Sequence, residues 1–394
     1  MEGLVFQNAR VITENGVLSG GCAASDGIIA GVWQGEIPSR FAAMPVYDAQ
    51  DCWLSPGLID GHVHGGGGAD FMDGTAEDIR TAAQAHLRCG TTMIAPTALT
   101  CADDALFAFF DNVRTAMRDK EDMPRFLGVH LEGPYFSPAQ AGAQPPQYLR
   151  QPERDHWQRI LEAGGDLIVR WSAAPELPGA LELGDALKDC GILASIGHTD
   201  ADYACVKEAM AHGYTHLTHF YSSMAGLKRV GGFRVLGTIE AGYLEDGLTI
   251  EIIADGMHLP PELLRLILKC KAHESISLVT DAMRGAGMPD GPSILGSKAD
   301  GVACVIEDGI AKMPDRTGFA GSVATADRLL RTMVEKAGLS VPEAVRMMSL
   351  NPARLYGVAG KAGSIQAGKF ADFVVFDEKL TVRDVFVGGR RIRR

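Results

Sequence analysis

The sequence has no pair of cysteines at C-x-x-C spacing, and its eight cysteines are scattered over 394 residues. A chain of this length can bury a sizeable core without disulfides, and dispersed cysteines are typical of a reducing compartment. No apolar run approaches the length that spans a bilayer, and the amino-terminal segment lacks a basic stretch followed by an apolar one. We therefore expect a cytoplasmic protein without a membrane partner.

Positive charge is also scarce. The chain carries 37 lysines and arginines against 49 aspartates and glutamates, which gives a formal net charge of -12. An acidic protein repels phosphate backbones, so we expect no nucleic-acid partner. An anionic small molecule would have to be bound by a few local basic groups. The arginine-rich end GGRRIRR is more typical of a solvated tail than of a binding patch.

The middle of the chain alternates short β-type runs with longer helical patterns. Eight candidate strands lie at 53–65, 91–98, 125–135, 167–177, 192–199, 215–222, 248–258 and 275–283. Most of the stretches between them have the helical spacing of alanine, leucine and isoleucine. Strand–helix alternation predicts a parallel sheet, and eight units match a (β/α)8 TIM barrel of about 250 residues. An open, doubly wound sheet is the competing architecture.

Both ends of the chain follow a different pattern. Residues 1–50 and 363–394 consist of short strands separated by turns, and neither segment has enough core to be stable alone. We expect them to pair into one small β-sandwich domain formed from both termini. The predicted division assigns 1–52 and 355–394 to this domain and 53–354 to the barrel.

The strongest local motif is His62-Val63-His64, at the carboxyl end of the first apolar run. Residues i and i+2 of a strand point to the same face, so both imidazoles project together. Barrel enzymes carry their chemistry at this end of the strands. An isolated H-x-H pair is more often structural, but its place at the mouth of a first barrel strand favours a functional role.

Metal-ligating residue types recur at the ends of later strands. These residues are Glu132, His198, His219, His258 and Asp281, on the third, fifth, sixth, seventh and eighth strands. The carboxyl ends of parallel barrel strands meet at one mouth, so the side chains should converge there. Neutral imidazoles with carboxylates are ligands for Zn²⁺ or Fe²⁺, and the sequence therefore predicts a divalent metal site.

A carboxylate beside such a metal is typical of hydrolysis. A metal lowers the pKa of bound water towards about 7, and a nearby carboxylate can carry the proton to the leaving group. We assign this role to Asp281, with a plain metal ligand as the alternative. Asp255 is predicted to be a turn residue. We expect His130 to line the barrel interior or support the site, and His216 to face away from the region of His219.

The motifs together resemble one family. PGLIDGHVHG, HLEGPY, GHT, THFYSSM, ADGMHLPP, TDAMRGAGMPDG and FAGS, in this order, are similar to the N-acetylglucosamine-6-phosphate deacetylases of the amidohydrolase superfamily. The resemblance covers nearly the whole chain. It implies a (β/α)8 barrel with a small β-domain, a homodimer, and hydrolysis of a small-molecule 2-acetamido sugar 6-phosphate to acetate and the amino-sugar phosphate in the cytoplasm.

The resemblance also implies a role for each strand-end residue. Glu132, His198 and His219 match the family's main metal ligands, whereas His62 and His64 match the pair that holds a second metal in some members. One or two ions are thus expected, Zn²⁺ first, with Fe²⁺, Mn²⁺ and Co²⁺ left open. Asp281 matches the family's catalytic acid/base, and His258 matches the histidine that polarises the substrate carbonyl.

The sugar contacts are only partly retained. Phe319, Ala320 and Gly321 correspond to a loop that contacts the sugar through its backbone. Ser222 and Ser223 stand where the family usually has Asn and Ala against the substrate. The resemblance therefore implies the same binding surface with altered side chains.

The phosphate contacts are altered as well. The family's G-A-H, whose His helps to bind phosphate, is Gly142-Ala143-Gln144 here, and its His-His-Arg is Lys228-Arg229-Val230. Arg229 and Arg234 are expected to supply phosphate contacts across a subunit interface.

Three alternatives stay open at this point. The same reaction could act on N-acetylgalactosamine 6-phosphate, another acetamido sugar or an N-acyl amino acid. Phosphoester or cyclic-amide hydrolysis on this scaffold typically uses a carbamylated lysine on a middle strand, and no strand end here offers a lysine. A non-catalytic barrel protein would lack ligands or the acid/base, whereas this chain has both.

Overall fold

The computed structural model describes residues 3–119 and 121–393. Its larger part is a sheet of parallel strands that follow one another in chain order. The eight barrel strands are β6 (Leu58–Val63), β9 (Thr91–Ala98), β11 (Val129–Glu132), β12 (Ile168–Ala173), β13 (Leu193–Ile196), β14 (Tyr214–Leu217), β17 (Thr249–Ile252) and β18 (Ile276–Leu278). A short strand, β10 (Arg125–Phe126), pairs with β9.

Backbone hydrogen bonds join the first and last segments of this sheet. The Asp281 N–H donates to the carbonyl of His62 at 2.9 Å, and the His64 N–H donates to the carbonyl of Ala282 at 2.8 Å. Because the strand order is sequential and its ends meet, the open doubly wound alternative is excluded. The prediction of a (β/α)8 barrel is confirmed.

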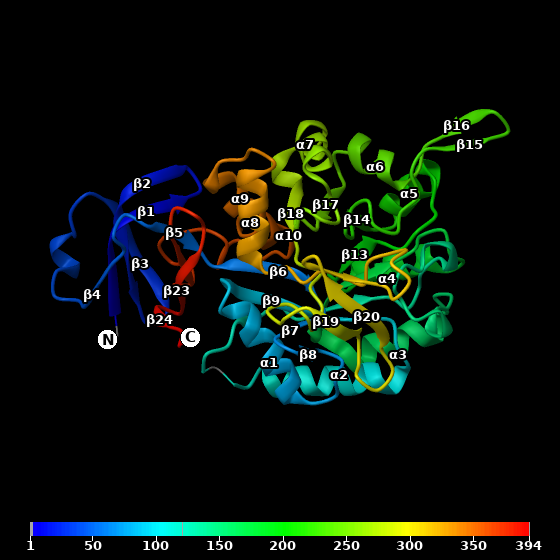
Figure 1. Cartoon of the computed structure of the whole chain (residues 1–394), viewed down its shortest axis with the longest axis horizontal. Helices are drawn as coiled ribbons and strands as arrows, with labels where there is room; N and C mark the ends of the chain where they lie inside the picture. Colours follow the sequence, from blue (N-terminus) through cyan, green and yellow to red (C-terminus); the bar gives the residue numbers. More distant parts are fainter. Residues whose placement is uncertain (1–2, 120, 394) are drawn as a thin grey trace.

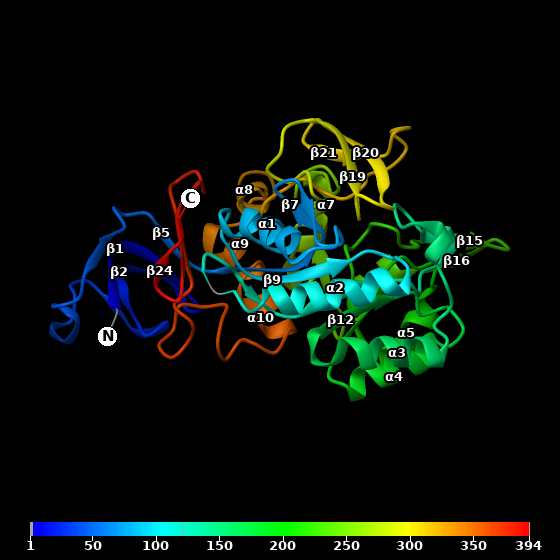
Figure 2. The same ribbon diagram turned by 90° about the horizontal axis from the view of Figure 1, so that it is seen from below.

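Helices surround the barrel (Figures 1 and 2). They are α1 (Ala76–Leu87), α2 (Asp103–Ala116), α3 (Arg154–Gly164), α4 (Ala180–Asp189), α5 (Tyr203–Ala211), α6 (Thr238–Leu244), α7 (Pro261–Cys270), α8 (Ala326–Glu335), α9 (Val341–Met347) and α10 (Leu350–Leu355). Helix α1 is typical: the Thr75 side chain accepts the Asp78 N–H, and Ile79, Ala83 and Leu87 form a buried stripe at helical spacing. Short 3-10 helices are η1 (Ser39–Phe41), η2 (Pro138–Gln140), η3 (Pro146–Tyr148), η4 (Gly165–Leu167) and η5 (His273–Ser275).

The two ends of the chain meet in a separate β-domain, at the left of Figure 1. Its strands are β1 (Gly3–Thr13), β2 (Gly16–Ser25), β3 (Ile28–Gln34), β4 (Val46–Asp48), β5 (Trp53–Pro56), β22 (Phe373–Phe376), β23 (Val382–Val387) and β24 (Arg390–Arg391). All eight are hydrogen-bonded into one sheet, so the two termini share a domain as predicted, within a single continuous sheet. Phe6 packs edge-on against Phe373 and Phe386 in its core.

The first predicted barrel strand divides between the two parts of the molecule. Trp53–Pro56 pairs with β1 and β22 of the small sheet, and β6 begins the barrel at Leu58. The chain thus passes from the small β-domain to the barrel at Gly57, slightly later than the predicted boundary at residue 53. The apolar run continues through both strands, so hydrophobicity alone could not show the break.

Two further β elements lie outside the barrel wall. A three-stranded antiparallel sheet of β19 (Gly291–Leu295), β20 (Val302–Glu307) and β21 (Ile310–Lys312) lies beside the barrel, at the top of Figure 2. The hairpin of β15 (Lys228–Val230) and β16 (Phe233–Val235) projects from the body in Figure 1, and a short ribbon joins β7 (Gly65–Gly66) to β8 (Ala69–Asp70). The sequence did not predict the three-stranded sheet.

Among the residues that the structure describes, no helix has both the length and the apolar character needed to cross a membrane.

Candidate active site

The predicted ligands meet at the carboxyl ends of the barrel strands. His62 lies in β6 and Glu132 ends β11, while His198 and His219 lie two residues after the ends of β13 and β14. Asp281 follows β18, so all of these side chains reach the same mouth of the barrel. They form two groups of potential metal ligands that share Glu132.

The first group consists of Glu132, His198 and His219. Oε1 of Glu132 lies 3.2 Å from His198 Nε2 and 3.0 Å from His219 Nε2. The two imidazole nitrogens lie 3.1 Å apart, and all three side chains are buried. The carbonyl of Gln140 lies 2.9 Å from His198 Nδ1, so the proton of this ring sits on Nδ1 and its Nε2 is free to act as a ligand.

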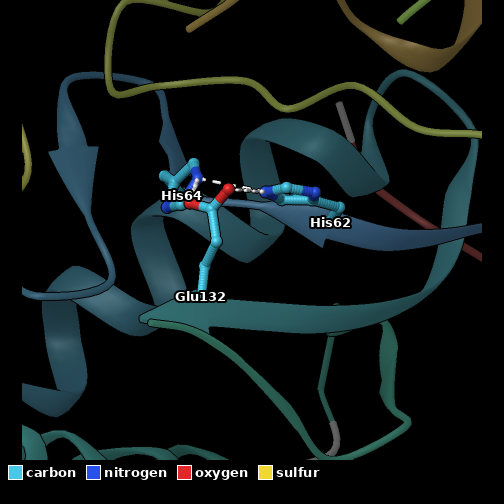
Figure 3. A group of neighbouring side chains, drawn as sticks. All are labelled: His62, His64 and Glu132. Carbon is cyan, nitrogen blue, oxygen red and sulfur yellow. Dashed lines mark hydrogen bonds and ion pairs between the residues drawn. The ribbon is translucent and has the colours of Figure 1, made fainter. Parts of the chain in front are cut away.

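The second group, His62, His64 and Glu132, is drawn in Figure 3. His64 Nε2 lies 3.2 Å from Oε2 of Glu132, and His62 Nε2 lies 3.5 Å from Oε1. The two histidine Nε2 atoms are 3.3 Å apart. Asp281 Oδ1 approaches the same pair, at 3.2 Å from His64 Nε2 and 3.5 Å from His62 Nε2.

These contacts fit divalent cations. Two imidazole nitrogens that face each other across 3.1 to 3.3 Å can share at most one proton, and neither is exposed to water. A cation placed between the two nitrogens and the Glu132 carboxylate would accept the lone pairs of all these atoms. Imidazole and carboxylate donors in this number suit Zn²⁺, Fe²⁺, Mn²⁺ or Co²⁺.

The charges of the site also favour a cation. Burial lowers the pKa of His62, but the carboxylates of Asp281 and Glu132 outweigh burial and raise this pKa to about 9. The pKa of His64 is raised well above its usual value for the same reason. Burial likewise opposes ionisation of Glu132, yet the surrounding histidines hold its pKa well below the usual range. The carboxylates thus require compensating positive charge, which protons or metal ions can supply.

The backbone at three of these residues is in the left-handed region. The φ angles are 48° at His198, 29° at His219 and 45° at Asp281. Residues with a Cβ seldom adopt this conformation, and it clusters at functional sites where it redirects a side chain. Here the three residues lie two or three positions after the ends of β13, β14 and β18, and this backbone conformation turns each side chain into the mouth.

His258 is held by a neighbour that the sequence interpretation assigned to a turn. Asp255 does accept the N–H groups of Met257 and His258, each at 2.9 Å, as a turn residue would. Its other oxygen lies 2.9 Å from His258 Nδ1. Asp255 therefore also orients the imidazole, and this role was missed. The D-G-x-H spacing was the available signal, because it places a carboxylate one turn before the ring.

A cavity of about 460 Å³ opens over the ligands. Of the predicted binding residues, those that line it are Ala143, Gln144, Ser222, Ser223, His258, Phe319 and Gly321. The three-stranded sheet and the segment after it contribute Leu295, Met313 and the Phe319 loop to its wall. Ala320 is fully buried behind this wall.

The two arginines predicted to contact phosphate do not line this cavity. Arg229 and Arg234 pair across the exposed β15–β16 hairpin, which projects away from the body. The described residues that line the cavity include neither lysine nor arginine. Neither arginine of this hairpin contacts the cavity of its own chain in this structure.

Gln144 has a contact that its predicted role did not include. Its Nε2 donates to Oε2 of Glu132 at 2.8 Å, and its Oε1 accepts the Thr100 N–H at 3.0 Å. The side chain is buried and lines the cavity. Gln144 therefore orients the Glu132 carboxylate, which belongs to both ligand groups, from the cavity side of the site.

The prediction that His216 faces away from the site is wrong. Its ring lies in the buried interior of the barrel, with Nε2 3.4 Å from Glu251 Oε2. Strand alternation fails between His216 and His219, because β14 ends at Leu217 and the positive φ of His219 turns that side chain back inward. The prediction for His130 is confirmed, since it packs edge-on against the His62 ring inside the barrel.

A barrel with imidazole and carboxylate ligands at its mouth defines the class of metal-dependent hydrolases. The model of the amidohydrolase family matches residues 53–392. The chain is 33% identical to N-acetylgalactosamine-6-phosphate deacetylase of Escherichia coli over 98% of both chains, and 33% identical to N-acetylglucosamine-6-phosphate deacetylase of Bacillus subtilis over 97% of this chain and 95% of that one. This chain belongs to the amidohydrolase family, in its N-acetylglucosamine-6-phosphate deacetylase branch.

Solved structures agree with this assignment. An aspartate-to-alanine mutant of N-acetyl-D-glucosamine-6-phosphate deacetylase from Mycobacterium smegmatis, in complex with N-acetyl-D-glucosamine-6-phosphate, superposes with a TM-score of 0.90 at 29% identity. The deacetylase from Pasteurella multocida gives a TM-score of 0.91 at 26% identity. Both comparisons cover 100% of each chain.

Proposed function

We propose that this protein hydrolyses the acetamide of N-acetylglucosamine 6-phosphate to glucosamine 6-phosphate and acetate. The observation that carries the proposal is the complete site, in which two ligand groups, Asp281 and His258 surround one cavity. The identity with deacetylases of acetylated amino-sugar phosphates over nearly the whole chain supports the substrate class. The acidic chain with scattered cysteines fits a cytoplasmic enzyme.

Glu132, His198 and His219 would hold one divalent ion, and His62 and His64 with Glu132 would hold a second. Zn²⁺ is our proposed metal because it accepts mixed imidazole and carboxylate ligands. When bound, the metal would polarise the acetamide carbonyl and make water acidic enough to lose a proton near neutral pH.

Asp281 is the residue that we assign to proton transfer. Its carboxylate accepts a proton as a water oxygen bonds to the acetamide carbon, and it delivers this proton to the nitrogen as the C–N bond breaks. The second proton of the water passes to the amine as the acid ionises, so the products are acetate and the protonated amine, and atoms and charge balance. Although burial opposes ionisation of Asp281, the neighbouring His62 and His64 hold its pKa below the usual value, and the group is therefore ready to accept a proton.

His258 and the cavity wall would position the substrate. Asp255 fixes the imidazole through Nδ1, and a proton on Nε2 would be donated to the acetamide oxygen. The residues that we expect to contact the sugar are Ala143, Gln144, Ser222, Ser223, Phe319, Ala320 and Gly321. Of these, Gln144 acts in part through Glu132.

A homodimer would complete the cavity with basic residues. The β15–β16 hairpin exposes Phe233 to 78% and Val230 to 57%, beside Arg229 and Arg234. Apolar side chains this exposed on a projecting hairpin favour burial against another protein surface. In a symmetric dimer, each hairpin would bring its arginines to the phosphate in the partner's cavity.

Acetate release from a panel of substrates tests this function. We expect turnover of N-acetylglucosamine 6-phosphate and a large loss of kcat/KM for N-acetylglucosamine and for N-acetyl amino acids. N-acetylgalactosamine 6-phosphate is the second candidate, because a relative named for that substrate is equally similar. A protein that is active on an unphosphorylated substrate but not on either phosphate would contradict the proposal.

A further inference from the structure

Beneath the two ligand groups, the barrel interior contains a carboxylate that touches both. Glu251 lies in β17 and is 1% exposed. Its Oε1 is 2.7 Å from His62 Nδ1 and accepts the backbone N–H of His219 at 3.0 Å. His62 belongs to one ligand group and His219 to the other, so a single oxygen atom contacts a member of each.

An arginine holds this carboxylate in place. Both terminal nitrogens of Arg170, from β12, donate to Glu251, Nη2 to Oε1 at 2.9 Å and Nη1 to Oε2. Arg170 is itself fixed by Ser195 Oγ and Thr218 Oγ1, each at 3.0 Å. The pair is fully buried and hydrogen-bonded from several strands, so the Glu251 carboxylate has little freedom to move.

This arrangement has a consequence for the ligands. An imidazole that gives its Nδ1 proton to a carboxylate leaves the Nε2 lone pair free, and His62 Nε2 faces Glu132 and Asp281. We propose that Glu251, clamped by Arg170, is the positioning residue of the metal centre, because it fixes the His62 ring and the backbone that carries His219. The inference rests on the metal site of the proposed function.

A Glu251→Gln variant tests it through metal binding. We expect about 10- to 100-fold weaker Co²⁺ binding, measured by competition with a chelator, and a changed visible absorption spectrum of bound Co²⁺. Glu245→Gln is the matched control, because Glu245 accepts hydrogen bonds from Tyr203 and Lys207 far from the barrel mouth. A folded Glu251→Gln protein with the affinity and spectrum of the wild type would overturn the proposal.

A second variant separates positioning from a purely structural role. Glu251→Leu combined with Arg170→Met removes both charges at once, and such apolar replacement of a buried ion pair is often tolerated. We expect the double variant to be more stable than Glu251→Leu alone, which leaves the Arg170 charge unpaired, with Co²⁺ affinity still reduced. Recovery of both stability and Co²⁺ affinity in the double variant would show that Glu251 serves the fold alone.

A third test leaves Glu251 and Arg170 unchanged. In the metal-loaded protein labelled with ¹⁵N-histidine, long-range NMR spectra should contain the signal of a ring protonated at Nδ1. The same signal should be absent from the spectrum of His62→Gln, which assigns it to His62. Protonation of this ring at Nε2 would refute the inference. These readouts need no substrate, so they stand even if the acetate-release panel contradicts the proposed function.

Discussion

Asp281 differs from the other carboxylate at the mouth by its contacts. Among the described residues, four histidines contact the Glu132 carboxylate, whereas two, His62 and His64, contact Oδ1 of Asp281. One carboxylate is thus embedded among ligands and the other lies at their edge, facing the cavity. This difference supports Glu132 as ligand and Asp281 as proton carrier.

An Asp281→Asn variant should therefore lose turnover while it keeps its metal. The amide has the shape of the carboxylate but cannot accept the proton, so we expect kcat to fall by roughly 10²- to 10⁴-fold. Acetate release and metal analysis on the same preparation measure the two properties. A variant that loses its metal as well would instead identify Asp281 as a ligand.

Asp255 lies farther from the reaction but controls His258. In an Asn replacement, the amide oxygen can keep the backbone N–H groups of Met257 and His258 while an NH2 donor faces Nδ1. The ring then loses its fixed orientation, and we expect kcat/KM to decrease by about 10- to 100-fold. Asp246→Asn, at an exposed site of the same strand–helix unit, is the control and should be neutral. If both variants keep full activity, His258 does not depend on Asp255 for its orientation.

At the scale of the strands, polar residues form a buried layer below the mouth. His130, Arg170, His216 and Glu251 come from β11, β12, β14 and β17 and are all fully or almost fully buried. Burial, reinforced by the charge of Arg170, lowers the pKa of His216 to about 4 despite the nearby Glu251. His216 is therefore neutral in the folded protein under conditions in which it is charged when unfolded.

This shift predicts a pH-dependent stability. Between the unfolded pKa of about 6.5 and the folded value of about 4, only the unfolded state binds the proton, so stability falls as the pH falls through this window. The contribution of His216 reaches about 3 kcal/mol at most. Urea unfolding of chelator-treated wild type and His216→Gln at several pH values should show a shallower slope in the variant. Equal slopes would contradict the assigned shift.

The elements that were predicted correctly, and the side chains that were predicted to converge and do so, are those encoded by local patterns. Strand–helix alternation predicted β9 as Thr91–Ala98, and the H-x-H spacing predicted that His62 and His64 lie together. Residues at strand ends must converge once the barrel closes, which is why Glu132, His198 and His219 could be named in advance.

Elements and contacts that depend on tertiary packing could not be predicted in this way. Arg170 and Glu251 are charged residues inside otherwise apolar strands, LIVRWSA and LTIEIIA. These charged residues were visible in the sequence. However, nothing in either segment shows that Arg170 forms an ion pair with Glu251 or that Glu251 also contacts His62. The sheet β19–β21 lies in an insertion whose place over the barrel depends on contacts such as Arg284 with Asp73.

Across the whole molecule, the proposed metal ligands connect segments that are far apart in the chain. His62 is on the first barrel strand, Glu132 on the third, and His219 beyond the sixth, and Glu132 belongs to both ligand groups. An ion that binds these residues only in the folded state stabilises the closed barrel as a unit. At a metal concentration about 1,000-fold above Kd, this linkage amounts to about 4 kcal/mol.

We therefore expect chelation to lower the Tm by several degrees and added Zn²⁺ to restore it, as measured by calorimetry. The control is Glu132→Gln, which removes the carboxylate shared by both ligand groups and should make the Tm insensitive to chelator and to Zn²⁺. If the Tm of the wild type does not change with metal, protons on the histidines are enough to balance the charges of the neighbouring carboxylates. If Glu132→Gln still responds to Zn²⁺, the ion that stabilises the fold binds elsewhere, and the assignment of Glu132 as the shared ligand fails.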